Sequence, residues 1–245
     1  MRRVQILGLP IDALTMEETI GLIFHSIQNN KPLQHVVVNA AKMVNAQRDE
    51  ALRQSIVESD IVNADGQAVV WASRFLGSPL PERVAGIDLM QRLVKLADEK
   101  GLKIYFLGAE EVVVHGVVSK YKSVYSKKII AGFRNGYFSP EEEEKVASDI
   151  RDSGAHILFV AMTSPKKEIF LNKYKALLNI PFIMGVGGSF DVVAGKVKRA
   201  PVWMQRWGLE WLYRVYQEPK RMWRRYLETN TLFILAVVKE KYFSK

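Results

Sequence analysis

Short apolar segments rich in β-branched residues alternate along the chain with longer segments of helical periodicity. Strands of a parallel sheet have this continuous apolar character because helices cover both of their faces. Between most of the short segments, apolar positions recur at the three- and four-residue spacings of amphipathic helices. The pattern therefore predicts an α/β domain with a largely parallel sheet flanked by helices. The strands are expected at residues 4–7, 35–39, 60–63, 103–107, 128–131, 157–161 and 182–186.

Two segments carry the signature of a helix start. Thr15 precedes an apolar periodic segment and is followed three residues later by Glu18, which together predict a reciprocal capping box. Ser139 is followed by Pro140 and by four glutamates, and proline and acidic residues both favour a first helical turn. We interpret residues 141–144 as a solvated helix start rather than as a metal site.

The last fifty residues differ from the rest of the chain in charge and in aromatic content. Residues 196–245 contain twelve of the 35 Lys and Arg but four of the 26 Asp and Glu, so they carry +8 of the total +9. Trp203, Trp207 and Trp211 follow Pro201 at intervals of four residues, which predicts one aromatic helical face. Cationic and amphipathic aromatic side chains together suit a membrane interface, although a phosphorylated ligand or nucleic acid is also consistent with the charge. We predict an α/β domain at residues 1–199 and a basic, aromatic helical appendage at residues 200–245.

Several classes of protein are disfavoured by what the sequence lacks. The chain has no cysteine, which removes disulfides, thiolate metal sites and a cysteine nucleophile. Pro10 and Asp12 interrupt the apolar N-terminal segment before a signal-peptide core forms, and the longest apolar run, residues 232–238, is far below the roughly 20 residues that span a bilayer. We therefore expect a cytoplasmic protein whose membrane contact, if any, is peripheral.

Polar residues at two expected strand ends are candidates for catalysis. Asp65 follows an apolar strand and Asn39 ends another, and open α/β sheets bind ligands at the carboxyl ends of their strands. A carboxylate at this edge is a candidate general base, and the alternative is an ordinary cap or turn.

Other segments are candidates for binding an anion. Arg83 lies in a proline-containing loop, where its planar fork suits a phosphate or a carboxylate. Gly187 and Gly188 follow the expected last strand, where glycines let backbone N–H groups approach a diphosphate. Neither this segment nor any other has a dinucleotide or Walker A spacing. The four histidines are scattered and no Asp-x-Asp triplet occurs, so we expect no metal and no cofactor.

In their order and spacing, several of these segments resemble the WecG/TagA/CpsF family of bacterial glycosyltransferases. The resemblance covers nearly the whole chain and implies a Rossmann-like catalytic domain. It also implies transfer of N-acetylmannosamine or a related sugar or uronic acid from a UDP-sugar to a polyprenol-diphosphate-linked acceptor at the inner face of the cell membrane. The matching segments are residues 39–40, 63–66, 81–89, 136–138, 164–168, 185–191 and 194–201.

The resemblance also implies roles for single residues. Asp65 matches the family's proposed general base, and Asn39 lies with it in the pocket. A second set is implied to contact substrate: Arg83, Tyr137, Lys167, Gly187, Gly188, Arg214, Arg221 and Arg224. Two positions depart from the family pattern, because Lys167 replaces a usual Gln and Val37 replaces a usual Thr. Both departures put the identity of the donor or acceptor sugar in doubt.

Two other functional classes are weighed against this interpretation. A nucleic-acid-binding module also uses basic and aromatic residues, but its charge should spread along one face and its motifs should be recognisable. A nicotinamide-dependent oxidoreductase fits the α/β pattern but should show the dinucleotide fingerprint. The sequence leaves homo-oligomerisation open.

Overall fold

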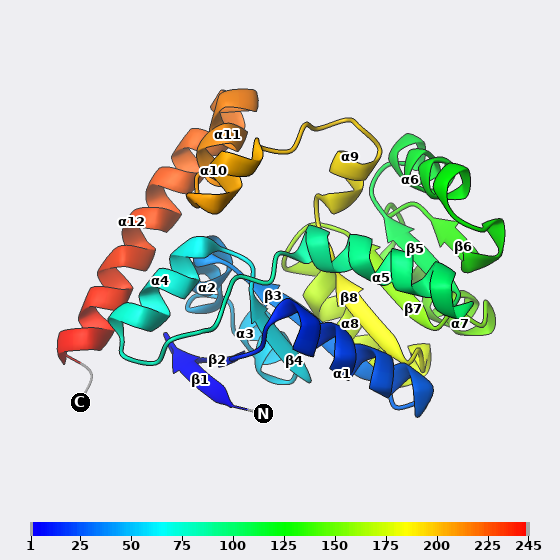
Figure 1. Cartoon of the computed structure of the whole chain (residues 1–245), viewed down its shortest axis with the longest axis horizontal. Coiled ribbons are helices and arrows are strands. Elements are labelled where there is room, and N and C mark those ends of the chain that lie inside the picture. The colour runs from blue at the N-terminus through cyan, green and yellow to red at the C-terminus, as the bar shows by residue number, and fades with distance from the viewer. Residues whose placement is uncertain (1, 244–245) are drawn as a thin grey trace.

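A six-stranded parallel sheet forms the centre of the computed structural model, which describes residues 2–243 apart from the side chain of Arg221 (Figure 1). The strand order is β4-β3-β8-β7-β5-β6, and every pairing within this sheet is parallel. The predicted fold class is therefore confirmed, and each of the six strands begins within two residues of its expected start. The strands are β3 (Leu33–Val38), β4 (Ile61–Ala64), β5 (Ile104–Gly108), β6 (Ile130–Arg134), β7 (Ile157–Ala161) and β8 (Phe182–Gly185).

The N-terminal segment forms a separate antiparallel hairpin of β1 (Arg3–Ile6) and β2 (Leu9–Asp12). The sequence predicted the first strand but not the second. Leu7 and Gly8 form the two-residue turn with positive φ values of 51° and 68°, as hairpin turns of this length require. The buried carboxylate of Asp12 accepts hydrogen bonds from Arg3 and from the backbone N–H of Val62, which fixes the hairpin against β4.

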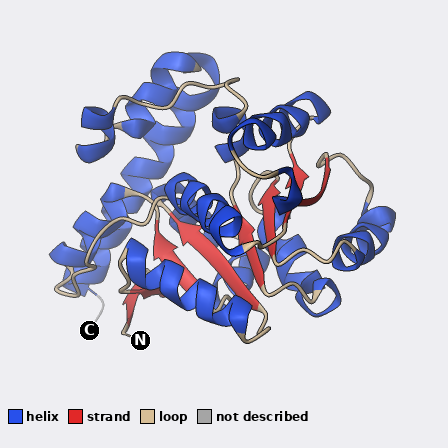
Figure 2. Ribbon diagram, turned by 45° about the vertical axis from the view of Figure 1, so that its right-hand side comes forward, coloured by secondary structure: helices blue, strands red, loops and turns tan. Residues whose placement is uncertain are grey.

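Helices cover both faces of the sheet (Figure 2). Because side chains alternate along a strand, Val37 and Phe159 face one core while Val38 and Leu158 face the other. The first face is covered by α1 (Met16–Gln28), α5 (Gly86–Lys100), α6 (Glu111–Val124) and the short α9 (Ser189–Val193). The second face is covered by α2 (Ala40–Ala46), α3 (Glu50–Val57), α4 (Gln67–Phe75), α7 (Glu143–Asp152) and α8 (Lys166–Leu178).

Both predicted helix starts are present. The Thr15 hydroxyl accepts a hydrogen bond from the Glu18 N–H at 3.2 Å, and the Glu18 carboxylate accepts one from the Thr15 N–H at 2.8 Å. Pro140 opens a single 3₁₀ turn, Pro140–Glu142, that leads into α7. Local hydrogen bonding therefore determines where these helices begin.

The C-terminal segment is divided into three helices, α10 (Val202–Arg206), α11 (Glu210–Gln217) and α12 (Pro219–Phe243). This division corrects the expectation of one aromatic face through Trp203, Trp207 and Trp211. Gly208, with φ of 66°, ends α10 and redirects the chain, because left-handed residues terminate helices. The three indoles therefore lie on two helices and the turn between them.

The long helix α12 packs along α2 and returns to the N-terminal hairpin (Figure 1). Phe233 and Val237 are buried in the same core as the hairpin, and the Glu240 carboxylate accepts a hydrogen bond from the Leu7 N–H at 2.6 Å. Across residues 2–243, no helix combines the length and the apolar character that crossing a membrane requires. Helix α12 therefore forms part of the core that also contains residues of β1 to β4.

Candidate active site

The carboxyl ends of β3 and β4 carry Asn39 and Asp65 at the same edge of the sheet, as the sequence predicted. The Asp65 N–H donates to the carbonyl of Val38 at 2.9 Å, which fixes its backbone at the strand end. The N–H of Val84 donates to the carbonyl of Ala64 at 2.9 Å, so the loop that contains Arg83 folds over the end of β4. Two segments that are distant in sequence therefore meet at Asp65.

The surroundings of Asp65 make its carboxylate take up a proton more readily than an exposed aspartate does. Its carboxylate is half-buried and accepts a hydrogen bond from the Gly86 N–H at 3.1 Å. Burial raises the pKa of Asp65 above its ordinary value, against the opposing effect of the Arg83 guanidinium and the Gly86 N–H. A carboxylate whose pKa is raised accepts a proton more readily, which is what a general base requires.

Asn39 lies beside Asp65 and shapes the same edge. Its side-chain oxygen accepts a hydrogen bond from the Lys42 N–H at 3.0 Å and thereby caps α2. A Cβ placed on Gly66 would lie 3.2 Å from the Cβ of Asn39, so the two strand ends are in close contact. Since the oxygen of Asn39 is used by the cap, its NH₂ group is the part that remains available to a ligand.

Arg83 belongs to a network of charges that the sequence analysis missed. Its guanidinium pairs with the carboxylate of Glu210, the first residue of α11. The other oxygen of Glu210 lies 3.7 Å from Arg199 Nε, and Arg199 donates two hydrogen bonds to Asp88 at 2.6 and 2.8 Å. Arg83 and Glu210 are 127 residues apart, and Arg199 and Asp88 are 111 residues apart. No sequence periodicity signals a pairing at such separations.

Of the three arginines that were expected to contact substrate from the C-terminal helices, Arg214 is one whose charge acts on Asp65. It is exposed on α11, one turn after Glu210, and its positive charge lowers the pKa of Asp65. Arg224 lies elsewhere: its guanidinium is 5.7 Å from the centre of the Trp223 ring, and it lines an open groove between α12 and Arg48. The expected role of Arg221 falls outside the described residues, because only the backbone of Arg221 is described.

Lys167 is buried in a cluster of charged side chains. Its ammonium lies 2.8 Å from Glu168, whose carboxylate also pairs with Lys42 at 2.7 Å. Burial lowers the pKa of Lys167 to about 8. Burial alone would raise the pKa of Glu168, but Lys42 and Lys167 lower it to about 2. The Lys167 side chain packs against Gly185, where an added Cβ would come within 3.0 Å of it.

The remaining predicted residues follow other strands of the sheet. Gly187, with φ of 53°, and Gly188 follow β8, which is separated from β4 by β3 alone. Tyr137 follows β6 and is largely exposed. The chain turns back after β6, because the Gly136 N–H donates to the carbonyl of Ala109 after β5 at 2.9 Å and a Cβ on Gly136 would lie 3.2 Å from Met162 after β7. The structure therefore places the glycines two strands from Asp65, and it places Tyr137 beyond them, where its charge acts on Lys196 after α9.

The part of the chain between residues 2 and 243 contains no group of three or more His, Asp and Glu side chains arranged to hold a metal ion. The charges that gather at this edge are instead those of Asp65, Arg83, Arg199, Glu210 and Arg214.

Known glycosyltransferases are similar to this chain over most of its length. A relative from Bacillus spizizenii, an N-acetylglucosaminyldiphosphoundecaprenol N-acetyl-beta-D-mannosaminyltransferase, is 35% identical over 88% of this chain and 82% of its own. A Bacillus subtilis protein with the same activity is 39% identical over 75% of this chain and 70% of its own. The sequence profile described as "Glycosyl transferase WecG/TagA/CpsF family" matches residues 4–245. The match favours a transferase over the nucleic-acid-binding and oxidoreductase alternatives, and the chain belongs to the WecG/TagA/CpsF family of glycosyltransferases.

Proposed function

We propose that this glycosyltransferase moves N-acetylmannosamine, or a related sugar or uronic acid, from a UDP-sugar to a polyprenol-diphosphate-linked sugar, with inversion at the anomeric carbon. The observation that carries the proposal is the half-buried carboxylate of Asp65, with its raised pKa, beside Arg83 at the carboxyl edge of the sheet. The names of the two relatives support the sugar and the acceptor. The product would serve the synthesis of a cell-surface polysaccharide such as teichoic acid.

The proposed chemistry is a single displacement. Asp65 takes the proton of the acceptor hydroxyl while the hydroxyl oxygen forms a bond to the anomeric carbon of the donor. The bond between that carbon and the diphosphate oxygen breaks, and UDP leaves with the electron pair. Arg214, Arg221, Arg224 and the backbone at Gly187 and Gly188 stabilise the charge that develops on the departing diphosphate. No cofactor takes part in this scheme.

Asn39 and Arg83 would orient the sugars around Asp65. The amide NH₂ of Asn39 and the guanidinium of Arg83 are both donors, and sugar hydroxyls and acyl oxygens accept hydrogen bonds. Lys167 is buried and paired with Glu168, so its charge would favour an anionic donor group such as a uronate from within this cluster rather than through an exposed contact. Tyr137 would contact substrate from the segment that lies over the ends of β5 and β7, beyond the glycine turn as seen from Asp65.

The acceptor lipid requires access to a membrane, and the C-terminal helices suit a peripheral position on its cytoplasmic face. Trp203, Trp207, Tyr216 and Trp223 are exposed on α10 to α12, among the basic residues of this segment. Exposed indole and phenol rings favour the lipid–water interface, and the basic residues favour anionic headgroups.

A donor screen with a soluble diphosphate-lipid acceptor analogue tests the proposal. UDP release should occur with UDP-N-acetylmannosamine or its uronate and should require the acceptor. EDTA should leave the rate unchanged, because cationic side chains rather than a metal would stabilise the leaving diphosphate. Absence of acceptor-dependent UDP release with every donor would refute the activity, and loss of the rate on chelation with recovery by Mg²⁺ would refute metal independence alone.

A further inference from the structure

Glu210 connects four segments that come together only in the folded chain. Its carboxylate contacts Arg83 in the loop over β4 and approaches Arg199 in the segment before α10, and Arg199 in turn holds Asp88 on α5. The Arg83 side chain is only 13% exposed and that of Glu210 is 30% exposed. Ion pairs that are partly shielded from water hold their partners more firmly than surface pairs do.

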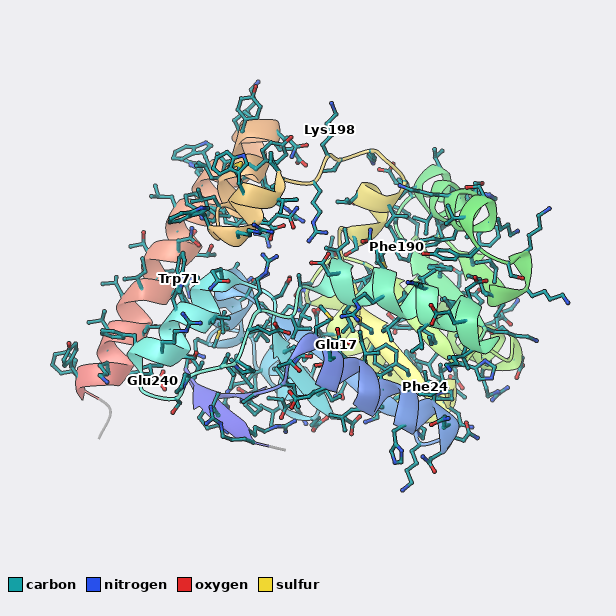
Figure 3. All side chains as sticks on the ribbon, viewed as in Figure 1. Glu17, Phe24, Trp71, Phe190, Lys198 and Glu240 are labelled. Atoms are coloured by element: carbon teal, nitrogen blue, oxygen red, sulfur yellow. The ribbon has the colours of Figure 1, made fainter. Side chains whose placement is uncertain are left out.

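A close backbone contact holds the start of α11 at the same place. Gly208 sits so tightly against α4 that an added Cβ would lie 2.8 Å from the Cβ of Gln67 and 3.2 Å from the Trp71 ring. Figure 3 shows Trp71 on α4, on the side where α10 and α11 lie. Gln67 is two residues from Asp65, so the turn before Glu210 is packed beside the catalytic strand end.

The far end of α11 is also attached. The side chain of Gln217 donates to the carbonyl of Lys198 at 3.0 Å and accepts from its N–H at 3.2 Å. Lys198 lies on the segment that links α9 with α10 (Figure 3). Between the two attachments, Arg214 follows Glu210 by four residues and thus shares its helical face. The charges of both residues act on Asp65.

We propose that Glu210 is a positioning residue, which locks α11 against the catalytic edge through Arg83 and Arg199 so that Arg214 faces the reaction centre. The inference rests on the proposed function for its catalytic consequence, but not for its structural one. Glu210 does not itself touch the reacting atoms. Its carboxylate sets the orientation of Arg83 and the distance between Arg214 and Asp65.

The first test measures the attachment without any substrate. Glu210→Gln keeps the size of the side chain and removes its charge, so the fold should persist. Amide hydrogen exchange of residues 209–217 should become roughly tenfold faster or more. The variant weakens the charged contacts of Glu210 with Arg83 and Arg199, and hydrogen bonds between charged groups are stronger than those between neutral groups. Exchange around Phe233 and Val237 on α12 should not change. The control is Glu99→Gln, which removes a carboxylate near the end of α5 whose ion pair with Lys95 is exposed.

The second test separates positioning from direct catalysis. Glu210→Gln should lower kcat by about 10²-fold, the order of loss that a displacement of 1 Å produces, and should leave the donor KM within roughly threefold. If Glu210 acts through Arg214, the double variant Glu210→Gln with Arg214→Ala should be no slower than Arg214→Ala alone. Glu99→Gln should retain the wild-type kcat.

The outcomes distinguish this inference from the proposed function. Faster exchange of α11 in a protein that has no transferase activity would refute the function and leave the attachment standing. Unchanged exchange of α11 in Glu210→Gln would overturn the inference whatever the activity. In an active enzyme, multiplicative losses in the double variant would overturn it as well, because two residues that act independently give that result.

Discussion

At the scale of the residue, the sequence located Asp65 and Asn39 because their positions follow directly from the strand pattern. A polar residue at the end of an apolar strand can be recognised without knowing the fold, and parallel strands bring such ends to one edge. The partners of Arg83 could not be recognised in this way. Glu210 meets Arg83, and Arg199 approaches Glu210, only because of the path of the C-terminal segment, which no local rule determines.

Asp65→Asn tests the catalytic carboxylate. The amide keeps the shape and can still accept the Gly86 N–H, but it cannot take a proton from the acceptor. We expect kcat to fall by roughly 10²–10⁴-fold, the usual contribution of a general base. Initial rates of UDP release measure this change, and an activity within about threefold of wild type would exclude Asp65 as the base.

The same variant should not destabilise the protein at neutral pH. Because the pKa of Asp65 is raised in the folded state, the folded protein holds the proton of this carboxyl group more tightly than the unfolded chain does. The free energy of unfolding therefore falls as pH rises from the unfolded-state pKa through the folded-state pKa. At pH 7 the ionised carboxylate is therefore a cost that asparagine removes. Thermal unfolding should give a Tm equal to or above wild type at pH 7, with the difference shrinking in acid. A lower Tm at pH 7 would contradict this electrostatic description.

Glu168→Gln tests the buried cluster. Removing the carboxylate leaves the ammoniums of Lys42 and Lys167 without their counter-ion, which should cost about 3–5 kcal/mol in the free energy of unfolding. Since the folded pKa of Glu168 is lowered to about 2, its contribution is present above its ordinary pKa of 4.5 and is lost as pH falls from there towards 2.

Denaturant unfolding measures both effects of Glu168→Gln. The exposed pair of Glu228 and Arg48 provides the control, because Glu228→Gln should cost less than about 1 kcal/mol. Equal losses in the two variants would show that the Glu168 cluster is no stronger than a surface ion pair.

At the scale of the element, sequence patterns predicted all six strands of the parallel sheet but failed where the chain turns sharply. The second hairpin strand contains Pro10, which obscures its apolar character, and its turn depends on Leu7 in a left-handed conformation. The expected aromatic helix was wrong because Gly208 interrupts it. A glycine in a periodic segment can either continue a helix or end it, and the sequence alone does not decide between the two. Here Gly208 has a left-handed conformation, which ends the helix, and its close contact with Gln67 leaves no room for a side chain.

The division of the C-terminal segment separates its arginines by element, and substitutions should reveal this. Arg214 acts on Asp65 from α11, so Arg214→Ala should lower kcat by roughly 10²–10³-fold, the cost of losing one preorganised charge contact. Arg224 lies at a groove of α12, and the proposed function nevertheless gives it a role in diphosphate binding.

The pair of variants therefore decides between two arrangements. A similar loss of kcat in Arg224→Ala would show that substrate reaches from Asp65 to α12. A loss confined to Arg214→Ala would restrict the diphosphate site to α11 and the glycine turn after β8. Lys239→Ala removes one charge from an exposed position of α12 and controls for net charge; it should leave kcat unchanged.

At the scale of the whole molecule, the composition shows that positive charge is concentrated at one end but not how that end is attached. The packing of Phe233 and Val237 in the core under β1 to β4 gives the answer. Deleting residues 200–245 would expose that core surface along with removing the basic helices. A truncation therefore cannot separate loss of membrane binding from loss of folding, and surface substitutions are required.

Membrane binding should depend on the exposed rings rather than on the fold. Trp203 and Trp207 are 59% and 70% exposed, so replacing both with alanine should leave the Tm and the circular dichroism spectrum unchanged. Burial of an aromatic side chain stabilises by about 1.5–3 kcal/mol, so the double variant should bind anionic vesicles at least roughly tenfold more weakly. Added salt should weaken the wild type further by screening the basic residues.

The control for membrane binding is Val112→Ala, which removes an exposed apolar side chain from α6. Sedimentation with phosphatidylglycerol vesicles would measure all three proteins. Undiminished binding by the tryptophan variant would mean that the membrane contacts another surface. Weak vesicle binding combined with full activity on a soluble acceptor would show that these rings bring the enzyme to its lipid substrate without taking part in the transfer.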